Sequence, residues 1–189
     1  MKAEDKMNMD AFEVITLAVA AESNSLEAMV NHMTQLLVGA LDIKGCSIFL
    51  LDKESNELER VATFGLSLAF VEKGPVMAGE SVARDMKGET VIIRDVSQDN
   101  QLQYPSETLR EGIGAIVSVP IIYLKEIIGV LRLYHHQGWD ISEKDVDAIR
   151  ILAGLIGVAV MHTRYLNGLQ SIAETLGDYP QNWITPRKR

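Results

Sequence analysis

The strongest hydrophobic period in the chain runs from Leu26 to Ala40. Apolar residues recur there at intervals of three and four, which is the spacing of one face of an α-helix. Asn24 and Glu27 lie three positions apart and fit a variant capping box at the start of this helix. The pattern predicts an amphipathic helix whose buried stripe consists of Leu26, Met29, Val30, Met33, Leu36, Leu37 and Ala40.

Helices are also predicted near both ends of the chain. Met9–Ala21 is apolar on one side and is followed by a run of residues that favour caps and turns. Ser142 and Asp145 have capping-box spacing, so a long last helix is expected to begin there. Between Ala148 and Met161 this helix is apolar on nearly every face, and such a helix has to be covered on more than one side. We expect the sheet to cover one side, and the N-terminal helix or a second copy of the chain to cover the other.

From Gly45 onward the period changes from helical to extended. Runs of β-branched and other apolar residues, bounded by turn residues, predict five strands. The first of them is apolar on both faces and is expected in the interior of the sheet. Pro120 predicts a bulge or an edge in the strand that contains it. The short turn at Leu124–Glu126 predicts that the last two strands are antiparallel neighbours. The expected strands are Cys46–Leu51, Leu58–Phe64, Thr90–Arg94, Ala115–Ile122 and Ile127–Tyr134.

Two long connections interrupt this sheet, at residues 65–89 and 96–114. Connections of that length usually contain short helices or carry function. Gly79–Met86 fits a short capped helix, and Ser106–Glu111 fits a helical turn. The order of elements predicts an α+β fold, in which an antiparallel sheet carries its N- and C-terminal helices on one face. The long connections then have to cover the other face, which places a cavity beneath them.

The composition fits a single globular domain. The chain has 189 residues, 47% hydrophobic and 23% charged, which suffices for a core and is too apolar for a disordered chain. Its net charge of −8 repels phosphate backbones, so no nucleic-acid partner is expected. The longest apolar run, Ile151–Met161, falls well short of the ~20 residues that cross a bilayer. Acidic residues near the N-terminus argue against an export signal. We expect a cytoplasmic protein without a membrane partner.

The sequence offers little for catalysis or metal binding. Cys46 is the only cysteine and lies in a predicted interior strand, where cysteine behaves as a small buried hydrophobe. His135 and His136 are adjacent on a strand and point to opposite faces, so they do not share a metal. No phosphate-binding glycine loop, nucleophile elbow or Ser-His-Asp order is present. We expect neither an enzyme nor a metal site.

A family resemblance rests on five segments taken in order: Gly45–Asp52, Gly79–Ala83, Gly88–Val96, Gly112–Ile121 and Ile128–Leu131. Together they resemble a GAF domain, the small-molecule sensory module of many signalling proteins. The resemblance divides the chain into an N-terminal dimerisation helix at 1–22, the GAF domain at 23–166, and the end of the last helix with a tail at 167–189.

The resemblance implies a six-stranded antiparallel sheet of order 2-1-5-4-3-6, with helices on one face and a ligand pocket on the other. Lys73–Met77 is the best place for the strand that the hydrophobic pattern does not show. GAF domains variously bind cyclic nucleotides, haem, bilins or amino acids, and many mainly dimerise, so the cofactor is unknown. The charged signature of the cyclic-nucleotide binders is not matched here. The GAF-type reductases of free methionine sulfoxide use several cysteines, and this chain has one.

The candidate ligand-binding residues lie on or beside the two long connections. A mostly apolar cavity with a few placed polar groups is the usual form of a small-ligand site. The alternative for each of these residues is that it only fills the core beneath the loops. Arginine can bind a carboxylate or phosphate through two hydrogen bonds, and for Arg110 the alternative is pairing with Asp95. The predicted site residues are Phe64, Phe70, Met77, Asp95, Tyr104 and Arg110.

These features predict a non-enzymatic sensory or regulatory protein. We expect it to bind an unidentified small molecule under the loops, to form a homodimer through its terminal helices, and to act on a separate downstream signalling protein. One alternative is a structural dimerisation or interaction module whose pocket holds no ligand. Another, disfavoured by the single cysteine, is a GAF-fold enzyme that reduces free methionine sulfoxide.

Overall fold

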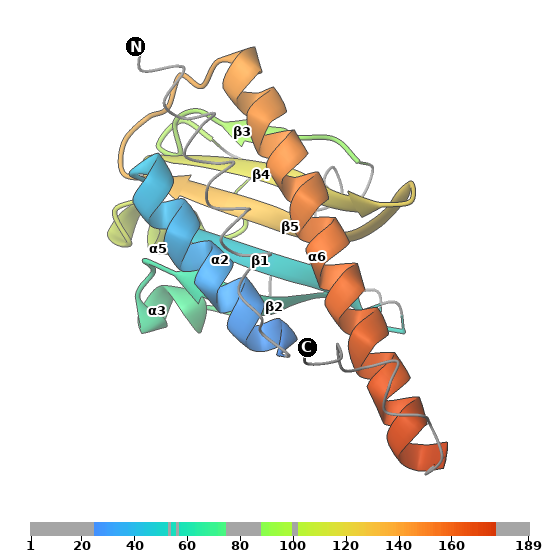
Figure 1. Cartoon of the computed structure of the whole chain (residues 1–189). Coiled ribbons are helices and arrows are strands. Elements are labelled where there is room, and N and C mark those ends of the chain that lie inside the picture. The colour runs from blue at the N-terminus through green and yellow to red at the C-terminus, as the bar shows by residue number, and fades with distance from the viewer. Residues whose placement is uncertain (1–24, 53, 56, 75–87, 100–101, 177–189) are drawn as a thin grey trace.

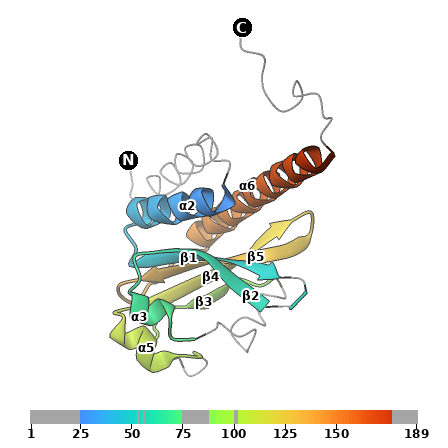
Figure 2. The same cartoon turned by 90° about the horizontal axis from the view of Figure 1, so that it is seen from below.

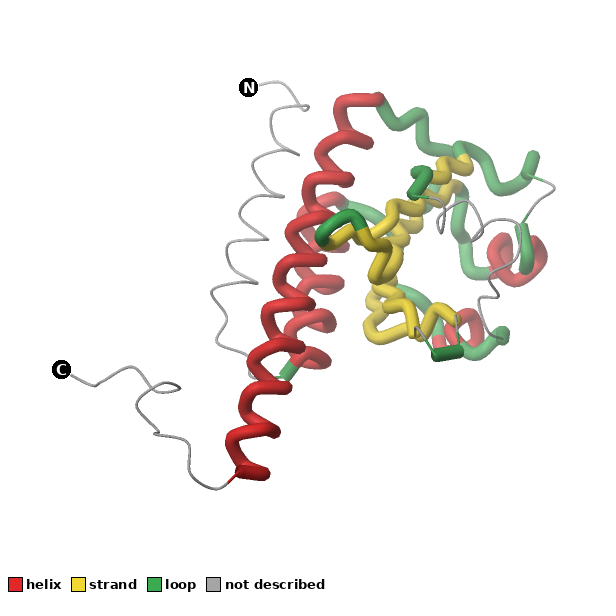
Figure 3. Tube along the Cα trace, turned by 90° about the vertical axis from the view of Figure 1, so that its right-hand side faces the viewer, coloured by secondary structure: helices red, strands yellow, loops and turns green. Residues whose placement is uncertain are grey.

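The computed structural model describes residues 25–52, 54–55, 57–74, 88–99 and 102–176. They form an α+β fold in three layers, with two long helices on one face of an antiparallel sheet and two short helices on the other (Figures 1 and 3). The fold class predicted from the sequence is therefore confirmed. The helices expected at Met9–Ala21 and Gly79–Met86, and the tail from Tyr179 onward, lie outside the described residues.

The sheet contains five described strands in the order β2-β1-β5-β4-β3, and every neighbouring pair is antiparallel. The expected extra strand at Lys73–Met77 is not found in the described part: Lys73 and Gly74 are not in a strand, and residues 75–77 lie outside it. The strands are β1 (Gly45–Asp52), β2 (Glu57–Phe64), β3 (Val91–Ile93), β4 (Ala115–Tyr123) and β5 (Glu126–His135).

The positions of β1 and β4 follow from their sequences. β1 is buried along most of its length and lies between β2 and β5, as its two apolar faces predict. β4 lies between β5 and β3, but the described pairing with β3 covers only Ile116–Ser118. The missing N–H of Pro120 therefore interrupts no ladder with β3. The register of β4 against β5 shifts between Ile121 and Ile122, so both the edge and the bulge expected near this proline are present.

The helix α2 (Leu26–Leu41) begins at Ser25, whose side chain accepts a hydrogen bond from the amide of Ala28 at 3.3 Å. The N-cap is thus Ser25, and the expectation that Asn24 caps this helix is wrong. Serine suits the position because its hydroxyl satisfies an amide that has no partner within the helix. The predicted stripe faces the sheet, and its fully buried members are Met29, Val30, Met33 and Leu37.

The helix α6 (Glu143–Leu176) crosses the same face of the sheet beside α2 (Figures 1 and 2). Ser142 caps it as predicted: its hydroxyl accepts from the amide of Asp145 at 3.2 Å and donates to the Asp145 carboxylate at 2.7 Å. The first half of α6 packs on β4, and its last turns extend beyond the sheet (Figure 1). The helix therefore has one supported half and one half that projects from the domain.

By length and composition alone, α6 is apolar enough to cross a membrane, with a mean hydropathy of 1.6 in its most apolar part. Half of that part is buried inside the fold. A core helix of a globular domain has the same length and composition, so this property carries little weight.

Three apolar clusters are found among the described residues, and the smallest of them consists of Phe49, Leu58 and Val130. The other two fill the two faces of the sheet. The larger lies between the sheet and the helices α2 and α6, and it includes Cys46, Leu131 and Leu133. The smaller lies on the opposite face, where the two long connections cross the sheet. Its buried members are Phe70, Val91, Ile93, Val96, Ile113, Ile116 and Tyr134.

Candidate functional site

A small cavity lies on the face of the sheet opposite α2 and α6. One wall is α3 (Leu68–Val71) with the turn that follows it, and the other is α5 (Pro105–Arg110) with the residues before it (Figure 2). Each of the two long connections thus supplies one wall. The cavity volume is about 30 Å³, room for no more than about two water molecules. Its lining consists of Phe70, Lys73, Leu102, Gln103, Tyr104, Thr108, Ile116, Arg132 and Tyr134.

Arg132, at the bottom of the cavity, belongs to a row of polar residues that crosses four strands. The strand registers align Thr63, Ser47, Arg132 and Ser118 on β2, β1, β5 and β4. Ser47 Oγ and Thr63 Oγ1 lie 2.9 Å apart, and Arg132 Nε donates to Ser118 Oγ at 2.8 Å. Both serines are buried. These hydrogen bonds satisfy the polar groups that the sheet buries, and they form a polar row on the face of the sheet where the cavity lies.

Phe70 and Tyr134 form the aromatic side of the cavity. Their rings meet edge to face, with centroids 5.9 Å apart and an interplanar angle of 86°. Burial raises the pKa of the Tyr134 phenol, although the charge of Arg132 and a hydrogen bond with Ser47 act in the opposite direction. The hydroxyl of Tyr134 therefore stays protonated at neutral pH.

Lys73 enters the cavity from the turn after α3. Its Nζ donates to the carbonyl oxygen of Phe70 at 3.0 Å. The same nitrogen lies 3.3 Å from the centroid of the Phe70 ring and 5.6 Å from that of Tyr104. The faces of aromatic rings attract cations, so the ammonium is held by two rings and a carbonyl.

The surroundings of Lys73 disfavour its positive charge. Its pKa falls from the ordinary value of 10.5 to about 8. Burial is the largest cause, and the charges of Arg60 and Arg132 act in the same direction. The carboxylates of Glu107 and Glu111 oppose this effect and are outweighed. At neutral pH Lys73 is still a cation, but its charged form is less stable here than in water.

A carboxylate ties the two walls together. Glu111, directly after α5, accepts hydrogen bonds from the amide of Ser67 at 2.9 Å and from its hydroxyl, and Ser67 caps α3. Lys44 Nζ lies 3.5 Å from the same carboxylate, whose side chain is largely buried. Burial acts to raise the pKa of Glu111, but the hydrogen bonds from Ser67 and the Lys44 charge outweigh it and lower the pKa. The carboxylate is therefore ionised at neutral pH and keeps α3 beside α5.

Two of the six predicted ligand-binding residues, Phe70 and Tyr104, line the cavity. The Tyr104 hydroxyl lies against Gly74, where an added Cβ would come within 2.6 Å of it. Glycine at that position, with φ +134°, lets the ring close over the turn that carries Lys73. A third predicted residue, Met77, lies outside the described residues.

Phe64 and Arg110 do not line the cavity. Phe64 pairs with Cys46 across the two strands, so both lie on the side of the sheet that faces the helices. Arg110 is exposed, two residues after Thr108, which is buried against the cavity. Two helical residues turn the chain by about 200°, which directs Arg110 away from the site.

Asp95 is held within its own turn and is not part of the cavity lining. Its carboxylate accepts from the amide and hydroxyl of Ser97 at 2.9 and 2.6 Å, and from Gln98 Nε2 at 2.7 Å. These hydrogen bonds, led by the Ser97 hydroxyl, lower the pKa of Asp95. Among the described residues it forms no ion pair with Arg110, the alternative that the sequence left open. The neighbouring Arg94 bonds Asp140 at 2.8 Å.

The cavity lining also includes residues that the sequence pattern does not predict as site residues, among them Lys73, Arg132 and Tyr134. Arg132 carries a signal, because it is the one charged residue within the predicted strand Ile127–Tyr134. A charge inside an interior strand needs a partner or a function. Lys73 carries no such signal, since its segment fits a loop as well as a strand.

A larger hollow of about 320 Å³ lies on the other side of the sheet, where β1 and β2 approach α6. Its charged residues Asp52, Glu59 and Arg164 are exposed, and Asp52 already accepts hydrogen bonds from Glu54 and Ser55 in its own turn. The described residues that line the hollow include no half-buried cation and no buried polar row. The smaller cavity is therefore the better candidate site.

The described part of the chain offers little support for a metal site or a reactive cysteine. No three His, Cys, Asp or Glu side chains gather there. Cys46 is buried, as predicted, and burial raises the pKa of its thiol. His135 stacks on Trp139, with ring centroids 5.0 Å apart.

Over residues 23–161 the chain matches the family model of the GAF domain. No curated protein sequence matches it. Among solved structures it is similar to the GAF domain of a phosphoenolpyruvate-protein phosphotransferase (ptsP) from Coxiella burnetii. That match has 21% identity and a TM-score of 0.76, and it covers 88% of this chain and 99% of that one.

Two further structures have the same fold. The GAF domain of a phosphoenolpyruvate-protein phosphotransferase from Acinetobacter is 21% identical, with a TM-score of 0.70 and coverage of 86% of this chain and 98% of that one. The free methionine-R-sulfoxide reductase of Neisseria meningitidis, solved with its substrate, is 18% identical, with a TM-score of 0.71 and coverage of 87% and 94%. At these identities the likeness concerns the fold.

Proposed function

The chain belongs to the GAF domain family, a general sensory and regulatory fold, and on this premise we propose that it is a non-enzymatic sensor. In this proposal a small molecule binds in the cavity between α3, α5 and the sheet. The change on binding reaches a homodimer interface formed by α6, and from there a downstream signalling protein.

The observation that carries this proposal is the alternation of side chains along β5. Arg132 and Tyr134 line the cavity, while Leu131 and Leu133 belong to the core beneath α2 and α6. Successive residues of a strand point to opposite faces. A ligand that favours one position of β5 therefore also favours one packing of the helices, which is how a binding event shifts a population of conformations.

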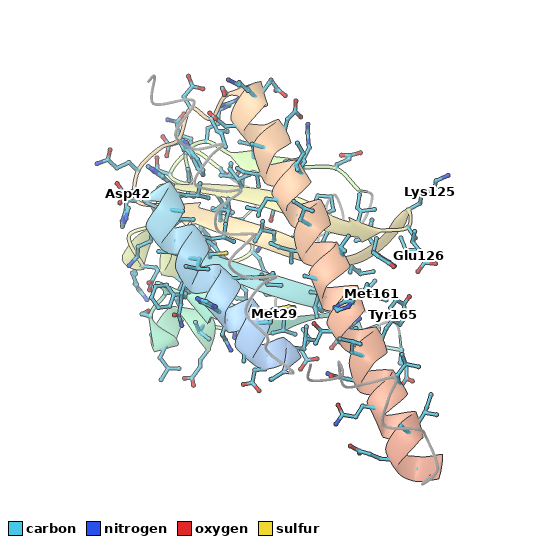
Figure 4. The ribbon with its side chains drawn as sticks, viewed as in Figure 1. Met29, Asp42, Lys125, Glu126, Met161 and Tyr165 are labelled. Carbon is cyan, nitrogen blue, oxygen red and sulfur yellow. The ribbon has the colours of Figure 1, made fainter. Side chains whose placement is uncertain are left out.

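The dimer is supported by the spacing of apolar residues on α6. Its outward residues recur at alternating intervals of four and three over three heptads, which is the spacing of a coiled coil. Most of them are more than half exposed, and Tyr165 lies where α6 passes the edge of the sheet (Figure 4). We name this set the α6 seam: Ile151, Leu155, Val158, His162, Tyr165, Leu169 and Ile172.

A second copy of the chain suits the α6 seam better than a partner of opposite charge. The residues that flank the seam in a coiled coil carry no charge in the described part of α6. Two copies therefore meet without repulsion between like charges, and Gly154 and Gly168 leave open space for close approach. The flanking residues are Leu152, Gly154, Ala159, Met161, Leu166, Gly168, Ala173 and Thr175.

An enzymatic role of the reductase type finds little support. The only cysteine of the chain is Cys46, which is buried on the helix side of the sheet and away from the cavity. A reactive thiol needs access and a lowered pKa, and burial acts in the opposite direction.

Sedimentation velocity at micromolar concentration tests the dimer. We expect a dimer for the wild type, and a monomer for Leu169→Lys, which places a charge in the α6 seam. Gln170→Lys is the matched control, because it adds the same charge to the outer face of the same turn. A monomeric wild type would contradict the proposal.

A thermal-shift screen of nucleotides, amino acids and haem tests ligand binding. A ligand at a hundredfold excess over its dissociation constant stabilises the folded state by ~2.7 kcal/mol. We expect at least one compound to raise the melting temperature, and to do so less in Tyr104→Ala than in the control Leu109→Ala, whose side chain is exposed on α5. A dimer that no compound stabilises would favour the alternative, a structural module without a ligand.

A further inference from the structure

Lys73 is a nucleophilic side chain in the cavity lining, and the function proposed above gives it no role. It is half-buried, so solvent still reaches part of its side chain. It has no carboxylate partner among the ion pairs of the described residues. Its nitrogen is therefore not engaged in a salt bridge there, and its chemistry depends on the cavity around it.

Phe70 holds the Lys73 nitrogen through one hydrogen bond and one ring contact. Nζ donates to the carbonyl oxygen of Phe70 at 3.0 Å and lies 3.3 Å from the centroid of its ring. Both of these groups are electron-rich, so they attract the N–H groups of an amine and repel its lone pair. In the neutral amine the N–H groups therefore face Phe70, and the lone pair faces away from it. The Tyr104 ring lies further from the same nitrogen, at 5.6 Å.

The surroundings of Lys73 favour its neutral form, and the neutral amine is the form that attacks a carbonyl carbon. Burial is the main reason why the pKa of Lys73 falls to about 8. At pH 8 about half of Lys73 is then neutral, whereas only roughly 0.3% of a lysine with the ordinary value of 10.5 is neutral. Lysines that burial or a nearby cation makes neutral in this way are the ones that form Schiff bases in proteins. The titratable groups around Lys73 are Arg60, Tyr104, Glu107, Glu111, Arg132 and Tyr134.

We propose that Lys73 captures a small aldehyde or ketone as a Schiff base in this cavity. The inference rests on the sensory function proposed above, and it adds the chemical class of the ligand and the bond that holds it. The neutral amine attacks the carbonyl carbon, and the carbonyl oxygen leaves as water when the C=N double bond forms. In sum, an ammonium and a carbonyl compound give an iminium ion and one water molecule. The step needs no oxidant or reductant, and hydrolysis reverses it.

The product of this step keeps the contacts that Lys73 makes with Phe70. Condensation leaves one N–H on the iminium nitrogen, and one N–H suffices for the bond to the Phe70 carbonyl oxygen. The iminium ion is still a cation, so the face of the Phe70 ring still attracts it. The cavity of about 30 Å³ has room for a substituent of roughly one or two carbon atoms, each similar in size to a water molecule. The site therefore favours small carbonyl compounds.

The experiment traps the Schiff base by reduction and locates it by mass spectrometry of peptides. The full-length wild type is treated with acetaldehyde and sodium cyanoborohydride at pH 8 in phosphate buffer, which converts each condensed lysine to N-ethyl-lysine. Lys144, which is exposed on α6, is the internal control. We expect Lys73 to be labelled at least about fivefold faster than Lys144, because more of it is neutral. The rate at Lys73 should also level off above about pH 8.

Two comparisons assign this preference to the cavity. In concentrated urea Lys73 and Lys144 should be labelled at similar rates, because the unfolded chain has no cavity. With pivaldehyde, which carries a bulky tert-butyl group, the ratio of the Lys73 rate to the Lys144 rate should fall at least about threefold relative to acetaldehyde. An exposed lysine provides the reference for the lower intrinsic reactivity of the bulky aldehyde.

A pair of variants tests capture without the reductant. Lys73→Arg keeps the positive charge but cannot condense, because a guanidinium stays protonated. Lys144→Arg makes the same change at an exposed position. In a thermal-shift measurement acetaldehyde should raise the melting temperature of the wild type and of Lys144→Arg, since a molecule held by the folded state stabilises it. It should leave Lys73→Arg unchanged.

The inference would be overturned by any of four results. They are equal labelling of Lys73 and Lys144 in the folded chain, a preference for Lys73 that urea or the bulky aldehyde does not reduce, a wild type that acetaldehyde does not stabilise, and a stabilisation that Lys73→Arg retains. Each of them leaves the sensory proposal intact, since a cavity also binds ligands without a covalent bond. The sensory proposal itself fails by the separate route of a monomeric wild type and a wider screen without a single stabilising compound.

Discussion

Thr163 of α6 places its hydroxyl oxygen 3.5 Å from the sulfur of Met29 on α2. The same hydroxyl lies 3.1 Å from the carbonyl oxygen of Ala159, and both side chains are buried. The two long helices therefore meet through buried side chains, and Thr163 is the last buried residue in the part of α6 whose burial is described.

Truncation of Met29 tests the packing at this junction. We expect Met29→Ala to lower the free energy of unfolding by about 2–5 kcal/mol, because it leaves a cavity between two helices. Thr163→Val keeps the shape and removes only the hydroxyl, so a change below about 1.5 kcal/mol is expected. Urea denaturation measures both, and His32→Ala, at an exposed position of α2, should change little. Equal losses for Met29→Ala and His32→Ala would contradict the close fit.

Gly129 allows β5 to approach β1 closely. An added Cβ there would lie 2.2 Å from the carbonyl oxygen of Phe49, which is backbone and has little room to move. Gly129→Ala is expected to destabilise the fold by more than about 2 kcal/mol through overpacking. Gly39, on α2, has nothing within 4 Å of such a Cβ, and Gly39→Ala should stabilise the protein by about 0.5–1 kcal/mol. Chemical denaturation of both variants checks the opposite signs.

Lys73 makes stability depend on pH in an unusual direction. Its pKa in the folded state, about 8, lies below its ordinary value of 10.5, so between these values the unfolded chain binds more protons than the folded one. Stability from this group therefore rises as the pH increases from 8 toward 10.5. At pH 7 both states are protonated and the buried charge is a cost.

The variant Lys73→Met removes this contribution. We expect it to be more stable than the wild type at pH 7 in buffers without added anions, with a difference that shrinks toward pH 10. Lys144→Met should show no such trend, because Lys144 is exposed. Urea midpoints at pH 7, 8.5 and 10 give the comparison, and a difference that stays constant with pH would contradict the burial of the Lys73 charge.

His162 interrupts the apolar sequence of the α6 seam. In a coiled coil a polar residue at a core position lowers stability, so His162→Leu is expected to tighten the dimer at least tenfold. The measurement is sedimentation equilibrium over a range of concentrations. His32→Leu adds the same apolar side chain to an exposed position of α2 and should leave the association unchanged. A looser dimer for His162→Leu would show that the interface lies elsewhere.

Most of the fold could be predicted from the spacing of apolar residues. The apolar stripe from Leu26 to Ala40 has to face the sheet, and β1, which is apolar on both faces, has to lie in its interior. Burial of this apolar surface is the dominant favourable contribution to folding. Ser25 was harder to assign, because Asn24 is an equally good cap by residue type and only the backbone geometry selects between them.

The location of the cavity could be predicted from the sequence, but only some of the residues that line it could be. Its location follows from the long connections, and Phe70 and Tyr104 are large side chains that those connections have to bury. The orientation of single residues does not follow: β2 contains an irregularity opposite Ile48 and Phe49, and such a shift changes which face later residues occupy. Phe64 lies beyond it. Lys73 lies in the cavity because its ammonium contacts the rings of Phe70 and Tyr104 and the carbonyl oxygen of Phe70. No local sequence pattern predicts these contacts.

The projecting half of α6 has a mechanical consequence. In the described part of the chain Thr163 is the last buried residue of the helix, and the turns from Arg164 to Leu176 extend past the sheet (Figure 1). At 1.5 Å per residue this segment is about 20 Å long, so a change in tilt of ~5° at its seat moves its tip by roughly 1.7 Å. In the sensor proposed above, a small displacement of β5 that tilts the seat of α6 would therefore produce a larger movement at the far end of this helix.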